Sequence, residues 1–321
     1  MTLLRAHPNT LVAVALCACV ILAVRSDPAW TDTAVLTGID TLIALSAGLS
    51  FGQAGILSMA QGAFAALGAY AAALAAIRLG LPGAAGLALA LAVPAAIGYA
   101  LARALIRLSP LATALATLAL GSLVDIVLRG WESLTGGYIG LAGIPGLGLI
   151  NTPLGYLLLV CAMLCISVFG YENLMHSRHG RALNVIRHDR ARARADGVDV
   201  NAVLSTALAL SAAMAGSAGW VYAHYISYLG PDSLTTNTSI AALLTAVIGG
   251  AGYILGPVFG TVLFEALQRF LPAQEAQGLF YGGALVVILL VARQGLLGLA
   301  ATSWRGRRRL RPVQAPASAA V

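Results

Sequence analysis

Ten strongly apolar stretches follow one another along this 321-residue chain, and they constrain its fold more than any other feature. A helix of about 20 apolar residues can cross a bilayer, because it satisfies its own backbone hydrogen bonds where lipid offers none. The composition agrees, since 59% of the residues are hydrophobic and only 10% are charged. We therefore predict an all-α, polytopic membrane protein with about ten transmembrane helices.

The predicted spans share a run of apolar residues bounded by polar, Gly or Pro residues. They are Leu11–Val24, Thr33–Leu49, Gly62–Ile77, Ala84–Ile106, Leu111–Leu128, Leu154–Phe169, Val203–Tyr225, Ile240–Ile248, Pro257–Leu271 and Leu279–Leu299. The shortest, Ile240–Ile248, is expected to begin earlier, within Leu234–Ser239. Residues 1–304 then form one transmembrane domain, and Arg305–Val321 forms a disordered basic tail rich in Ala and Pro.

One long polar segment, Tyr171–Val200, joins the sixth and seventh spans and carries six arginines. Positive charge between spans favours the cytoplasmic side. With this segment inside and ten crossings, both termini are cytoplasmic. Most other arginines then also fall inside, including Arg5, Arg103, Arg107, Arg293 and those of the tail, and only Arg25, Arg78, Arg129 and Arg269 fall outside. Topology therefore explains the net charge of +7, and we expect no nucleic-acid partner.

All 19 basic residues are Arg, and the chain has no Lys. A phosphate-binding loop of the Walker A kind needs a Lys, so any ATPase that drives transport is another polypeptide, which would hold the ATP and Mg²⁺. The four cysteines, Cys17, Cys19, Cys161 and Cys165, lack zinc-site spacing, and we expect no metal on this chain. No nucleophile or acid–base motif suggests an enzyme.

Two Gly-rich segments interrupt the apolar pattern, Gly48–Gly62 and Ile248–Gly260. Non-helical backbone at membrane depth must be buried in protein or line a watery cavity, and broken helices commonly frame the substrate path of transporters. Close helix packing through small residues is the alternative. We weigh the two about evenly for the glutamines and favour packing for the glycines. The candidate path residues are Gln53, Ser58, Gln61, Gly249 and Gly250.

Three acidic residues fall within predicted spans, where ionisable groups are expected to be functional or paired. Asp125 precedes Arg129 by four residues, so an intrahelical ion pair is the simpler interpretation. Glu265 stands in the same relation to Arg269. Asp40 has no such partner. A proton-coupled carrier would need several unpaired carboxylates, so this count disfavours one.

From about Leu45 to Leu299 the chain resembles the permease subunits of branched-chain (hydrophobic) amino-acid ABC importers. The resemblance depends on the order and spacing of several short motifs. They are Gly48-Leu-Ser-Phe-Gly-Gln-Ala-Gly, Gln61-Gly-Ala-Phe, Thr135-Gly-Gly-Tyr-Ile-Gly-Leu-Ala-Gly-Ile-Pro145, Gly180-Arg-Ala-Leu, Ile186-Arg, Ala195-Asp-Gly-Val, Ser211-Ala-Ala-Met-Ala-Gly-Ser-Ala-Gly219, Gly249-Gly-Ala-Gly-Tyr-Ile-Leu-Gly-Pro257 and Gly295-Leu-Leu-Gly298.

The resemblance implies a bacterial inner-membrane importer with a division of labour. A periplasmic binding protein captures the solute, this chain and a second homologous permease form the pathway, and two cytosolic ATP-binding-cassette subunits drive it. The default solutes are branched-chain amino acids, although related systems take other small polar solutes.

The resemblance also implies that Gly180–Gly197 contains a short cytoplasmic coupling helix that inserts into the ATPase. Apolar side chains such as Leu183 and Ile186 are expected to form the docking face, with the arginines solvated. The chain departs from the family at Arg194 and Asp196. The expected coupling residues are Gly180, Arg181, Ala182, Leu183, Ile186, Arg187, Asp189, Ala195 and Gly197.

Two other functions remain to be weighed against an importer permease. A stand-alone secondary carrier or channel would leave the basic segment as a purely topological loop. A non-transporting scaffold would leave both Gly-rich segments unexplained.

Overall fold

The computed structural model describes residues 7–270, apart from 26, 106, 107, 149 and 151, together with residues 295 and 298. Within this part the chain is predominantly helical. Its helices are α2 (Pro8–Val24), α3 (Pro28–Ala47), the π-helix η1 (Gly48–Gln53), α4 (Gln61–Leu79), α5 (Gly83–Leu105), α6 (Pro110–Gly130), α7 (Glu132–Thr135), α8 (Pro153–His176), α9 (Arg178–His188), α10 (Arg190–Ala195), α11 (Val200–Ile226), α12 (Thr236–Gly249) and α13 (Gly256–Phe270). Two short strands, β1 (Leu141–Ala142) and β2 (Tyr228–Leu229), pair antiparallel.

Local sequence explains where several long helices begin. Pro occupies the first helical position of α2, α3, α6 and α8, where its missing N–H costs no hydrogen bond. The side chains of Asp27, Ser109 and Thr152 precede three of these prolines and accept hydrogen bonds from backbone amides of the first turn. Such N-terminal caps satisfy amides that a helix leaves unpaired.

Each of the first nine predicted apolar stretches overlaps a helix, but the count of ten crossings is not confirmed. Six helices in the described part are long and apolar enough to span a membrane: α3 with η1, α4, α5, α6, α8 and α11. The apolar helices α2 and α12 are shorter. The tenth stretch, Leu279–Leu299, lies outside the described residues except at positions 295 and 298, as do Arg5, Arg293 and the tail Arg305–Val321.

Two predicted boundaries need correction. Helix α8 continues to His176, so the polar segment loses its first residues to the helix and begins at Ser177. The first Gly-rich segment is not irregular throughout, because Gly48–Gln53 continues α3 as a π-helix and the non-helical part is confined to residues 54–60. A π-helical turn widens the helix and is frequent at functional sites.

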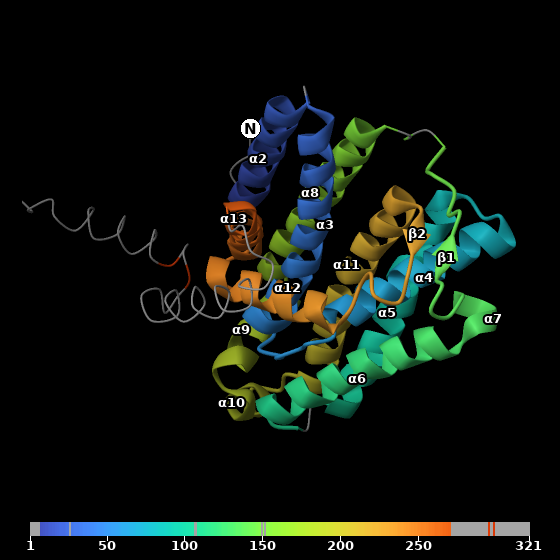
Figure 1. Ribbon diagram of the computed structural model, residues 1–321. Helices are drawn as coiled ribbons and strands as arrows, with labels where there is room; N and C mark the ends of the chain where they lie inside the picture. Colours follow the sequence, from blue (N-terminus) through green and yellow to red (C-terminus); the bar gives the residue numbers. More distant parts are fainter. Residues whose placement is uncertain are drawn as a thin grey trace, which may run out of the picture.

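Helix α11 lies at the centre of the bundle and packs against α3, α4 and α5 (Figure 1). Small residues let these backbones approach closely, as in many membrane proteins. A β-carbon on Gly68 of α4 would collide with the backbone of Gly216 in α11, and one on Gly219 would collide with the carbonyl oxygen of Ala65.

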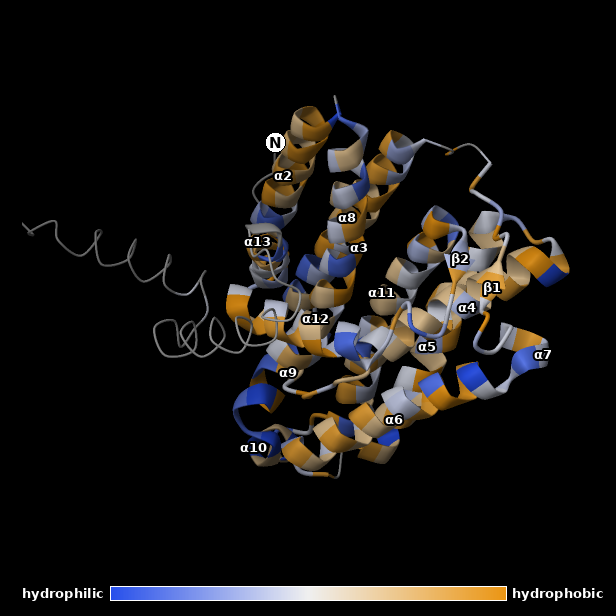
Figure 2. Ribbon diagram, in the orientation of Figure 1, coloured by the Kyte–Doolittle hydropathy of each residue, from blue (hydrophilic) through white to orange (hydrophobic). Residues whose placement is uncertain are grey.

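Two regions outside the long helices lie apart from each other, and one of them is strongly hydrophilic (Figure 2). The strongly hydrophilic helices α9 and α10 lie beside residues 54–60 and the turn after α12, and we call this region the α9 end. The strands and α7 lie away from it, where Arg78 at the end of α4 donates a hydrogen bond to the carbonyl of Ser133. We call this second region the strand end.

Candidate functional site

The polar segment after α8 folds into two short helices, which confirms that it contains helical structure. Ser177 caps α9, and its hydroxyl accepts a hydrogen bond from the Gly180 amide at 3.3 Å. Asp189 ends α9 and caps α10, with its carboxylate accepting from the amides of Ala191 (2.8 Å) and Arg192 (3.1 Å). Gly197 follows α10 with φ of 79°, the left-handed conformation that favours Gly, as predicted for a helix end.

One face of α9 is buried in the protein itself. Gly180, Leu183 and Ile186 recur at a spacing of three and are the buried residues of this helix. Leu183 and Ile186 are 1% and 2% exposed and belong to the main hydrophobic core. The prediction that these two side chains form an outward docking face is therefore wrong. They anchor α9 to α11 and η1 instead.

The opposite face of α9 is exposed and forms a shallow groove with α10 of about 370 Å³. Among the residues that line the groove, Val185 is an exposed apolar side chain, 39% accessible. Charged and polar side chains surround it, namely Asn184, His188, Asp189, Arg192 and Asp196. An exposed apolar side chain beside charged and polar ones suits a protein-docking surface.

The remaining expected coupling residues occupy the same segment with different exposure. Arg181 is exposed, and its guanidinium donates to the His176 carbonyl at 3.3 Å. Ala182 is half-buried, whereas Ala195, the last residue of α10, is exposed. The segment thus has a buried face that holds it in place and an exposed face that carries most of its charge.

Arg187 of α9 lies beside both Gly-rich segments. A β-carbon on Gly55 would lie 3.8 Å from Cγ of Arg187, and one on Gly252 would lie 4.0 Å from its guanidinium nitrogens. The two segments also touch each other, because the Gln53 side-chain amide donates to the Gly252 carbonyl at 3.2 Å. A β-carbon on Gly52 would collide with the carbonyl of Ala251. Both breaks therefore meet directly beneath α9.

The non-helical backbone at residues 54–60 obtains hydrogen bonds from side chains of other helices. The Met59 amide donates to the Thr117 hydroxyl of α6 at 3.0 Å. Just after the break, the Gly62 amide donates to the Ser239 hydroxyl of α12 at 2.8 Å. Ser58 is fully buried, and its hydroxyl accepts from the Ala60 amide at 3.4 Å. These bonds satisfy backbone groups that lipid could not.

Gln61 lies at the centre of a buried hydrogen-bond network and is 0% exposed. Its carbonyl oxygen accepts from the Ser46 hydroxyl at 2.9 Å. Its amide nitrogen donates to the hydroxyls of Ser50 at 3.0 Å and Ser211 at 3.2 Å. The network joins α3, η1, α4 and α11, so Gln61 supports packing at this site. Whether it also borders a translocation path stays a prediction.

Gly249 and Gly250 form the tight connection between α12 and α13. A β-carbon on Gly249 would collide with the carbonyl oxygen of Gly256, and Gly250 adopts φ of 108°. Gly adopts such a positive φ readily, and its lack of a β-carbon allows the close backbone contact. The geometry agrees with the packing interpretation of the glycines, and their place along a path stays a prediction.

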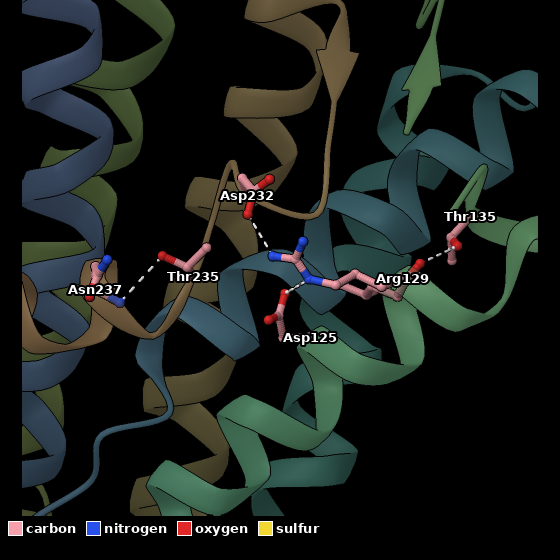
Figure 3. Close-up of polar contacts among 7 residues, drawn as sticks. Asp125, Arg129, Thr135, Asp232, Thr235 and Asn237 are labelled. Carbon is pink, nitrogen blue, oxygen red and sulfur yellow. Dashed lines mark hydrogen bonds and ion pairs between the residues drawn. The ribbon is translucent and has the colours of Figure 1, made fainter. Parts of the chain in front are cut away.

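The predicted pair of Asp125 and Arg129 is confirmed, with 3.2 Å between Oδ1 and Nε. Arg129 also forms an ion pair of 2.5 Å with Asp232, which lies between β2 and α12 (Figure 3). The two ion pairs of Arg129 connect the end of α6 to the segment that leads into α12. The analogous pair of Glu265 with Arg269 is not tested, because the side chain of Arg269 is not among those described.

A model of the family described as "Branched-chain amino acid transport system / permease component" matches residues 30–291. The chain belongs to this permease family. It is 30% identical to the high-affinity branched-chain amino acid transport system permease protein LivM of Escherichia coli and 28% identical to LivM of Salmonella typhimurium. Each match extends over 297 residues and covers 83% of this chain and 69% of the relative. No solved structure matches the chain.

Family membership confirms the resemblance drawn from the short motifs. The relatives are permease components of transport systems, and the six long apolar helices agree with a multi-pass membrane protein. The two Gly-rich segments and the whole polar segment lie within the matched range. The geometry at the α9 end therefore belongs to a transport permease.

Sequence reasoning missed one buried charge at the α9 end of this permease. Glu172, 1% exposed near the end of α8, accepts hydrogen bonds from the backbone amides and side chains of Asn9 and Thr10 at 2.7–3.2 Å. These residues form the first turn of α2, where unpaired amides attract a carboxylate. The sequence offers one sign of this buried charge, a single Glu directly after an apolar stretch. Its hydrogen-bond partners could not be predicted, because they lie more than 160 residues away along the chain.

Proposed function

We propose that this chain is a permease subunit of an ATP-binding-cassette importer in the bacterial inner membrane. With a second homologous permease, it forms the path for branched-chain amino acids or related small polar solutes delivered by a periplasmic binding protein. Two cytosolic subunits bind ATP and Mg²⁺ and hydrolyse the nucleotide, and they dock on α9 and α10. Both termini face the cytoplasm.

The arrangement of α9 is the observation that carries this proposal. The helix is anchored in the core by Leu183 and Ile186, and its Arg187 lies beside both Gly-rich breaks. Its other face offers Val185 within a charged groove. A basic loop with a purely topological role would need neither the buried anchor nor the groove. The family match adds that the relatives belong to transport systems, which disfavours a stand-alone carrier.

The same contacts provide a mechanism for coupling. A force on the groove moves α9 as a unit, because its inner side chains are packed against α11 and η1. Arg187 transmits this motion to the backbone at Gly55 and Gly252. Gly55 and Gly250 adopt positive φ, with values of 65° and 108°, and are suited to act as hinges because Gly tolerates large backbone changes. ATP-driven motion would thus rearrange both breaks together.

Co-purification of the ATPase subunits with variants of α9 tests the proposal. Val185→Asp replaces the apolar side chain of the groove with a charge and should reduce recovery of the ATPase at least about tenfold, with the permease still folded. Leu183→Asp should lower both ATPase recovery and the thermal stability of the permease, because its side chain is buried in the core. Arg192→Ala on the rim should be mild.

Ile139→Asp is the matched control, since Ile139 is 83% exposed and lies in the α7–β1 connection at the strand end. It should leave recovery of the ATPase unchanged. Full recovery with Val185→Asp, or an equal loss with Ile139→Asp, would show that the groove is not the docking site.

A further inference from the structure

A polar cavity of about 320 Å³ lies where α3, α12 and α13 pack against one another. Two carboxylates face it, Asp40 from α3 and Glu265 from α13. The amide side chains of Asn237 and Gln268 and the hydroxyl of Thr238 also line it. Two acidic side chains, Asp189 and Asp196, also line the α9–α10 groove, but Arg192 accompanies them there, whereas no arginine of the described residues lines this cavity.

Asp40 is placed at membrane depth, near the middle of the 26-residue span formed by α3 and η1. Within the described residues it forms no ion pair or hydrogen bond, in contrast to Asp125 with its arginine partner. A carboxylate at this depth is costly and is expected to serve a function. Glu265 carries a like charge and lines the same cavity as Asp40. A second negative charge facing the same cavity increases its attraction for a cation.

The surroundings of the cavity also suit a translocation path. Helix α12 has only 14 residues, and half-length helices of this kind often border the solute site of transporters. Asn237 and Thr238 lie in the first turn of α12, where the helix terminus favours negative groups. A cavity of this polarity cannot open to lipid hydrocarbon, so it opens to water or to another protein surface.

We propose that this cavity binds the zwitterionic head group of the transported amino acid. Asp40 and Glu265 are the counter-charges of its ammonium group, and Asn237 and Thr238 bind its carboxylate. The inference rests on the proposed function, because an amino-acid solute comes from that proposal. It adds the residues that contact the solute on its way through the permease.

Uptake by the complete transporter in proteoliposomes, with leucine as solute, tests the inference. Asp40→Asn and Glu265→Gln should each lower the maximal uptake rate at least about tenfold, because each removes a counter-charge of the ammonium group. Asp40→Glu, which keeps the charge, should retain a substantial part of the rate. Glu132→Gln, an exposed carboxylate in α7, is the control and should leave uptake unchanged.

Co-purification of the ATPase subunits and their basal ATP hydrolysis are measured on the same samples. If the unaltered chain recovers no ATPase, the proposed function fails. A different result overturns the cavity inference alone. In that case the unaltered chain recovers the ATPase, and Asp40→Asn and Glu265→Gln, present in normal amounts, both take up leucine at the normal rate.

A second measurement tests the inference even if the Asp40 and Glu265 variants fail to accumulate in the membrane. Asn237→Cys should react faster with a cationic methanethiosulfonate reagent than with an anionic one, by about tenfold, after subtraction of the reaction of the native cysteines. Leucine presented by the binding protein should slow both reactions. Equal rates without protection by leucine would overturn the inference. Uptake that requires Na⁺ and is lost in choline would assign the cavity to an inorganic cation instead.

Discussion

Gln61 shows, at the scale of single residues, how the structure extends the sequence-based prediction. The Gly-rich context identified a polar side chain at membrane depth, and its burial is now explained by three serine partners from α3, η1 and α11. Those partners could not be predicted, because Ser211 lies 150 residues away along the chain. By contrast, the pair of Asp125 and Arg129 was predictable, since residues four apart on one helix are neighbours.

Replacement of Gln61 by Leu should destabilise the protein. The change removes the amide group that donates to the hydroxyls of Ser50 and Ser211 and the oxygen that accepts from the Ser46 hydroxyl. Loss of the partner of a buried polar group costs about 1–3 kcal/mol. Gln53→Leu, which removes one hydrogen bond to Gly252, should cost less. Thermal unfolding in detergent measures both. Unchanged unfolding of Gln61→Leu together with lost uptake would instead support a direct role along the path.

The predicted faces of α9 illustrate the limit of sequence patterns at the scale of elements. The spacing of Gly180, Leu183 and Ile186 indicates one apolar face of a helix. It does not say whether a partner protein or the chain itself covers that face. The core of the permease covers it, and the helix therefore presents Val185 and its polar neighbours outward. The element was predictable, whereas its orientation depended on long-range packing.

Helix α2 provides a second prediction at this scale. Glu172 holds its first turn through hydrogen bonds to Asn9 and Thr10. Glu172→Gln removes the negative charge that these donors and the helix N-terminus favour, so it should lower the free energy of unfolding by about 1.5–3 kcal/mol. Glu132→Gln, an exposed glutamate, is the control and should change it by less than about 0.5 kcal/mol. Thermal unfolding of both variants measures the effect. If Glu172→Gln loses no more stability than Glu132→Gln, Glu172 does not hold the first turn of α2.

For the whole molecule, apolar patterning predicted the class of the protein and located most of its long helices. The number of crossings was less certain, because α2 and α12 are shorter than most membrane-spanning helices and their roles depend on how they pack. The meeting of the two Gly-rich segments beneath α9 was also beyond the sequence. They are separated by about 200 residues and are joined only by tertiary contacts such as that of Gln53 with Gly252.

The orientation of the molecule gives a prediction at the same scale. The basic helices α9 and α10 should face the cytoplasm, since positive loops are retained inside. In intact cells, a membrane-impermeant thiol reagent added outside should label Ile139→Cys and leave Arg190→Cys unmodified. Both positions should react after the membrane is permeabilised. Labelling of Arg190→Cys from outside, with Ile139→Cys protected, would invert the proposed topology.

The central claim is that the α9–α10 groove receives a separate ATPase subunit. Site-specific photo-crosslinking tests it most directly, with a photoreactive amino acid at Val185 in the groove and, for comparison, at Ile139 at the strand end. We predict that the probe at position 185 crosslinks the ATPase subunit in the assembled transporter and that the probe at position 139 does not. Crosslinking of the ATPase from position 139, with none from position 185, would contradict the account.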